Sequence, residues 1–240
     1  MLLRDGGIVW MNKLEGAIRL SRSVEYMFWG LGGMMIVLSF DRLLSLSPFT
    51  TLRYLHLFPL AVFFAGALDL PMDAFPGRDW EGACRRLKYC AVFLLGLAPF
   101  WVWWHSAPEN MYFKINNAIF LCTASLTLFN IAGLSVAASE AKDRRLVRFL
   151  GKMTRLATIY LCFGPVCAFF IADLMLLGKK NGHDIFIFAE NMANWKLYLV
   201  EAPAMMALLL LLFLRDTRPA NCPASDKENM NEIKKTDSPA

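Results

Sequence analysis

Three ionisable side chains stand inside apolar stretches of this sequence: His56, Asp173 and Glu201. Charged groups within bilayer-spanning segments are rare, and they usually mark an ion or substrate pathway. Each of the three lies about one helical turn, or slightly more, from the same predicted end of its segment. We therefore predict that they line one ion- or ligand-binding vestibule. Two carboxylates close together there would share a proton or a bridging cation.

A second pattern is a stripe of polar residues along the apolar segment 115–138. The stripe comprises Asn116, Thr123, Thr127 and Asn130. Their separations of 7, 4 and 3 positions place them on one helical face at about 100° per residue. Hydrocarbon cannot satisfy an amide, so this face is predicted to meet other helices or water. Two interpretations stay open, namely hydrogen bonds between helices and one wall of a polar translocation path.

Histidine and cysteine residues give weaker signals. The three histidines are His56, His105 and His183, and the six cysteines contain no CxxC pair. Facing histidines can bind haem, and three histidines with a carboxylate can bind zinc, but His56 and His105 do not lie deep in their segments. The sequence also lacks a phosphate-binding loop, an HExxH motif and a GxGxxG motif. We predict no cofactor, no metal and no catalytic residue.

The elements that must position these residues are apolar blocks of bilayer-spanning length. A spanning helix needs about 20 mainly apolar residues. Six such blocks lie at about residues 24–40, 52–70, 87–105, 115–138, 156–177 and 196–214. Hydrophobic residues make up 57% of the chain and charged residues 19%, whereas soluble domains average roughly 45–50% and 25%. The blocks lack the strict alternation of strands. The sequence therefore predicts an all-α, polytopic integral membrane protein with a bundle of about six transmembrane helices.

The basic residues predict how this bundle is oriented. Of the 25 Lys and Arg residues, 19 lie in the N-terminal segment, the second and fourth connections and the C-terminal tail. Basic residues near spans mark the cytoplasmic side, so both termini are predicted to be cytoplasmic and the chain to lie in the cell membrane. The asymmetry accounts for the net charge of +5 without a nucleic-acid partner.

Three regions follow from this topology. Residues 1–23 form a cytoplasmic, partly amphipathic segment, residues 24–214 form the membrane domain, and residues 215–240 form a tail. The tail is charged and contains prolines but no aromatic residue, a composition typical of disorder.

The sequence leaves three function classes open. We predict first a non-enzymatic membrane component, such as an accessory subunit or assembly factor, with the lipid bilayer and other membrane subunits as partners. The alternative is a small transporter or channel coupled to a proton or cation. It draws support from the polar stripe, the carboxylates and a match of residues 54–70 to residues 160–176 at seven of 17 positions, because transporters are often built from inverted repeats. The second alternative is a membrane-embedded enzyme that uses the histidines and carboxylates.

Overall fold

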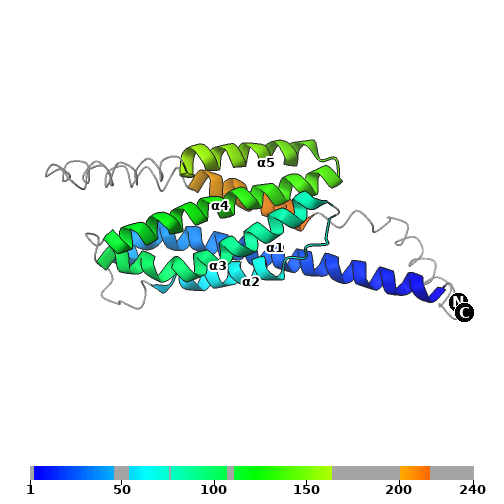
Figure 1. Cartoon of the computed structure of the whole chain (residues 1–240), viewed down its shortest axis with the longest axis horizontal. Helices are drawn as coiled ribbons and strands as arrows, with labels where there is room; N and C mark the ends of the chain where they lie inside the picture. The colour runs from blue at the N-terminus through cyan, green and yellow to red at the C-terminus, as the bar shows by residue number, and fades with distance from the viewer. Residues whose placement is uncertain (1–2, 46–53, 76, 107–110, 164–200, 217–240) are drawn as a thin grey trace, which may run out of the picture.

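The computed structural model describes residues 3–45, 54–75, 77–106, 111–163 and 201–216, and these residues form helices without a strand (Figure 1). The five α-helices and the π-helix are α1 (Leu3–Ser45), α2 (Leu57–Asp69), α3 (Arg78–Ser106), α4 (Met111–Ala141), α5 (Arg145–Ala157) and η2 (Thr158–Phe163). Residues 201–215 form a further helical segment. The predicted all-α class is confirmed.

α4 lies at the centre of the packing. It contacts α3, α5 and η2, while α1 packs along α2 and α2 also meets α3. The helices run side by side along the long axis of the molecule, and the N-terminal part of α1 extends past the others (Figure 1). The main core joins α1, α2, α3, α4 and the segment 201–215, with Met27, Leu87 and Leu211 completely buried. Arg215 adds an ion pair to Glu25 of α1 at 3.5 Å.

Glycine residues allow α1 and α2 to approach closely. A Cβ atom added at Gly66 of α2 would lie 2.6 Å from the Ser23 carbonyl oxygen and 2.8 Å from the Met27 nitrogen. A Cβ atom at Gly30 of α1 would overlap the backbone of Phe63. Small residues at such contacts are typical of helix pairs in membranes, where close backbone packing replaces the hydrophobic effect between helices.

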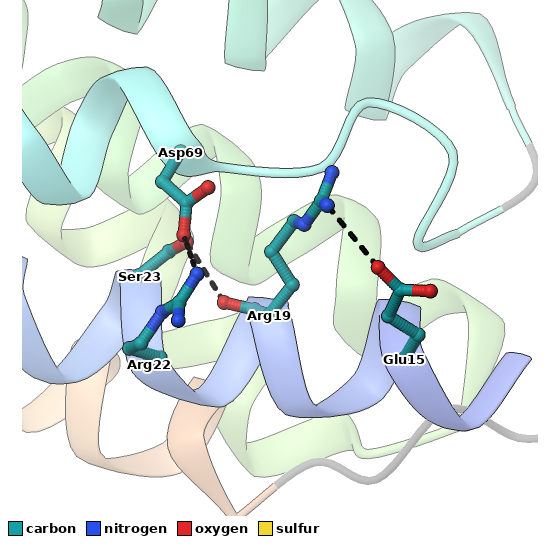
Figure 2. Close-up of polar contacts among 5 residues, drawn as sticks. All are labelled: Glu15, Arg19, Arg22, Ser23 and Asp69. Carbon is teal, nitrogen blue, oxygen red and sulfur yellow. Dashed lines mark hydrogen bonds and ion pairs between the residues drawn. The ribbon is translucent and has the colours of Figure 1, made fainter. Parts of the chain in front are cut away.

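An ion pair closes one end of this helix pair (Figure 2). Arg22 of α1 donates to the carboxylate of Asp69, the last residue of α2, at 3.0 Å, and the Ser23 hydroxyl lies 3.4 Å from the same carboxylate oxygen. The Ser23 hydroxyl also lies 2.8 Å from the Arg19 carbonyl oxygen, and Arg19 pairs with Glu15 at 3.3 Å. Each charged group in this contact therefore has a partner.

The helix bounds differ clearly from the predicted blocks in three places. α3 begins at Arg78, nine residues before the predicted third block, so the basic stretch that precedes this block is helical. The predicted N-terminal segment and the first block belong to one continuous helix of 43 residues. The basic connection before the fifth block is also helical, because α5 begins at Arg145 and carries apolar residues at helical spacing. Residues 164–177 of the fifth block and 196–200 of the sixth lie outside the described residues. By length and composition, one helix of the described chain, Ala118–Glu140, is able to cross a membrane.

Candidate functional site

The structure describes two of the three predicted vestibule residues. His56 caps α2 and is buried, with its Nε2 atom 3.3 Å from the Ala98 carbonyl oxygen of α3. Glu201 is half-buried and begins the segment 201–215. Asp173 lies outside the described residues. A shared vestibule of these three side chains therefore stays a prediction.

The polar stripe of α4 lies mainly inside the bundle. Thr123 and Thr127 are buried, and their hydroxyl groups donate to the carbonyl oxygens four residues earlier at 2.7 and 2.8 Å. Asn116 is half-buried and donates to the Tyr112 carbonyl oxygen at 2.8 Å. These hydroxyl and amide groups thus find acceptors on their own helix.

Asn130 joins α4 to α3. Its Oδ1 atom accepts a hydrogen bond from Arg86 Nε of α3 at 3.2 Å. Its Nδ2 atom donates to the Leu126 carbonyl oxygen at 2.8 Å and lies 3.7 Å from Cys90 Sγ of α3. Asn130 is only 4% exposed, so removal of its amide would leave Arg86 without this acceptor.

A second arginine reaches the same place from α5. The Arg155 guanidinium lies 5.1 Å from the centre of the Phe129 ring, within the range of a cation–π contact. A Cβ atom at Gly133 would lie 2.7 Å from Arg155 Nη2, so the glycine leaves room for the guanidinium. Arg155 Nε is buried and has no hydrogen-bond partner within the described chain. Burial and then the charge of Arg86 lower the pKa of Arg155, while Asp79 and Glu140 act in the opposite direction.

These arginines border a cavity of about 600 Å³ between α3, α4 and α5. Its charged lining residues are Asp79, Arg86, Glu140, Lys152 and Arg155, and its other lining residues are Phe129, Gly133, Val136 and Ala137. No ion pair within 4.0 Å joins any two of the five charged groups, as far as the described residues show. Three cations and two carboxylates thus share the cavity without direct neutralisation.

The charges are sorted along the cavity. Arg86 lies level with Asn130, and Ala83 lies level with Gly133, so α3 and α4 are antiparallel. Glu140 is ten residues beyond Asn130, which is about 15 Å at 1.5 Å per residue. Asp79 precedes Arg86 by seven residues and lies toward that same end. The two guanidinium groups therefore lie beside Phe129 and Asn130 at one end of the cavity, and the two carboxylates lie toward the α4–α5 turn.

In the sequence, Arg86 and Arg155 belong to the basic residues that predict the orientation of the bundle. The two residues are 69 positions apart, and their convergence depends on the register of three helices. The sequence does hold a signal for this convergence, because each arginine directly precedes a predicted span and Asn130 offers an amide within the polar stripe. The cavity can hold an anion, whereas the described residues contain no group of three His, Cys, Asp or Glu side chains that could hold a metal ion.

No family model, no curated protein and no solved structure matches the chain.

Proposed function

We propose that the chain is a non-enzymatic, multi-pass component of the cell membrane with about six transmembrane helices and cytoplasmic termini. The observation that carries this proposal is the state of the α4 polar stripe. Thr123, Thr127 and Asn130 are buried and hydrogen-bonded within the bundle. A translocation path needs polar groups that face water, whereas these groups are satisfied inside the bundle by carbonyl oxygens of α4 and, at Asn130, also by Arg86 of α3.

Exposed apolar side chains support contact with lipid. Trp29 and Ile36 of α1 are 63% and 61% exposed, and Phe93 of α3 is 60% exposed. Further exposed apolar residues lie on the surface of α4 and of the segment 201–215, including Leu126 and Leu209. Large apolar side chains so exposed on several helices fit a hydrocarbon environment better than water.

Arg86 and Arg155 favour an inner membrane boundary near Asn130, which shifts the span toward Met111 relative to the predicted block 115–138 and to the membrane-capable stretch Ala118–Glu140. Arg86 and Arg155 directly precede the predicted third and fifth spans. From Met111 to Asn130 α4 has 20 residues, which is about the 30 Å of a hydrocarbon core. Beyond Asn130, α4 is still apolar, and this part is buried by other helices: Ile131 and Leu134 are fully inaccessible. α4 would then extend into the cytoplasm as a buried helix.

The surface of α5 favours a subunit among non-enzymatic roles. Val147, Gly151 and Thr154 are buried on one side of the helix. Leu146 and Phe149 point away, with exposed fractions of 72% and 59%. These two residues precede the predicted fifth span, and apolar patches outside the hydrocarbon typically mark protein contacts. We therefore propose that α5 contacts another membrane subunit.

Two measurements test this role. Reconstituted in proteoliposomes, the purified chain should give proton and cation fluxes equal to those of protein-free vesicles. In native membranes solubilised with a mild detergent, it should migrate in one larger complex, and Leu146→Glu with Phe149→Glu should release it. Ile18→Glu is the matched control for added charge, because Ile18 is 60% exposed and lies in the N-terminal segment predicted to be cytoplasmic. Ion flux by the isolated chain, or a complex that both sets of variants leave equally intact, would contradict the proposal.

A further inference from the structure

The cavity between α3, α4 and α5 holds two guanidinium groups without a compensating ion pair. Among the residues that the structure describes, neither Arg86 nor Arg155 has a carboxylate oxygen within 4.0 Å. Arg86 uses its Nε atom on Asn130, so its terminal nitrogens are available to a ligand. Arg155 Nε is a buried donor without an acceptor. Buried donors are nearly always satisfied in folded proteins, and an exception calls for a ligand or water.

We propose that this cavity binds a phosphate group between the guanidinium groups of Arg86 and Arg155. A guanidinium presents its donors in a planar fork that matches two phosphate oxygens, and two such forks surround a tetrahedral anion. Lys152 adds a third positive charge on the wall of the cavity. Gly133 keeps the space beside the Arg155 guanidinium open, because a side chain there would displace it.

The cavity accepts more than an isolated ion. Its volume of about 600 Å³ is that of a small-molecule site. Phe129, Val136 and Ala137 supply an apolar wall beside the arginines. Asp79 and Glu140 lie toward the α4–α5 turn, where carboxylates can accept hydrogen bonds from hydroxyl groups and disfavour a second anionic group. The chemistry fits one phosphate that carries an apolar or hydroxylated body. An anionic phospholipid headgroup and a soluble phosphate ester both have this chemistry.

Binding by the full-length protein in detergent solution tests the proposal. One arm titrates phosphatidylglycerol against phosphatidylcholine in mixed micelles, and native mass spectrometry counts the retained lipids. The other arm titrates inorganic phosphate and glycerol 3-phosphate, with sulfate-free buffer and the shift in melting temperature as the readout. The assay does not depend on the topology or partners of the protein, so its failure is distinguishable from failure of the proposed function.

Three variants locate the site. Arg86→Gln and Arg155→Gln should each weaken binding about tenfold or more, since each removes charge-assisted hydrogen bonds. Gly133→Ala should also weaken binding, because the added methyl group moves the Arg155 guanidinium while it keeps every charge. The matched control is Arg85→Gln. Arg85 neighbours Arg86 but pairs with Glu81 at 2.6 Å and does not line the cavity.

The outcomes are distinct. A lipid headgroup is supported if the wild-type protein retains phosphatidylglycerol in preference to phosphatidylcholine, if the three variants abolish this preference, and if Arg85→Gln changes it by less than twofold. The same variant pattern with glycerol 3-phosphate, and no preference between the lipids, supports a soluble phosphate ester. If folded wild-type protein binds none of the probes, or if Arg85→Gln reduces binding as much as Arg86→Gln, the proposal is overturned. Circular dichroism of each variant establishes that it is folded. If an arginine variant is unfolded, the binding measured for Gly133→Ala tests the site instead.

Discussion

The α1–α2 pair and the α3–α4–α5 cavity use charged residues in opposite ways. Between α1 and α2 the backbones touch through Gly30 and Gly66, and the pair ends in the Arg22–Asp69 contact, where each charge has a partner (Figure 2). In the cavity, charges of both signs stand apart, and one buried guanidinium donor lacks an acceptor. The first arrangement is what stability requires. The second has a stability cost, and a ligand would offset it.

A glycine substitution between α1 and α2 should lower the stability of the protein more than the other substitutions described below. Gly66→Ala places a methyl group against the Ser23 and Met27 backbones, and overpacking of this kind costs about 1–3 kcal/mol. Gly96→Ala is the control, because a Cβ atom there has nothing within 4 Å. It should be neutral or stabilise α3 by up to about 1 kcal/mol through helix propensity. Thermal unfolding in detergent measures both variants. Equal melting temperatures would mean that α1 and α2 are not closely packed.

Asn130→Leu should have the next largest effect. It removes the hydrogen bond from Arg86 of α3 and the bond from the amide to the Leu126 carbonyl oxygen, and each such hydrogen bond contributes about 0.5–1.5 kcal/mol. Asn116→Leu tests the same chemical change at a half-buried position, where the amide bonds only its own helix. The Asn116 variant should unfold within a few degrees of wild type and the Asn130 variant clearly earlier. If the Asn116 variant unfolds earlier than the Asn130 variant, Asn116 contributes more to stability than Asn130 does.

Asp69→Asn should have the smallest effect. The Arg22 and Asp69 side chains are 56% and 33% exposed, and partly exposed ion pairs contribute about 0–1 kcal/mol. The loss should shrink in 0.5 M salt, because salt screens exposed charges. Glu15→Gln removes the more exposed pair with Arg19 and should be near neutral. A loss from Asp69→Asn as large as that from Gly66→Ala would show that the ion pair, not glycine packing, holds α1 and α2 together.

Some of this organisation could be predicted from the sequence. The helical class followed from long apolar blocks without alternation, and the burial of Thr127 and Asn130 followed from their spacing on one face. The cavity could not be predicted. Arg86 and Arg155 lie on α3 and α5, and only the packing register brings both beside Phe129, Asn130 and Gly133. The sequence shows these arginines only as basic residues near the ends of predicted spans. The spacing of residues within one helix does not give the rotation of that helix relative to its neighbours.

The proposed function depends on an orientation in which α4 crosses the membrane with its Met111 end outside and its Ala141 end inside. It is tested most directly by cysteine labelling in sealed cells and inverted vesicles, in a background without the six native cysteines. Tyr112→Cys and Lys152→Cys are suitable because both positions are exposed. A membrane-impermeant maleimide should label Tyr112→Cys only from outside and Lys152→Cys only from the cytoplasmic side. Labelling of both positions from the same side would contradict the account.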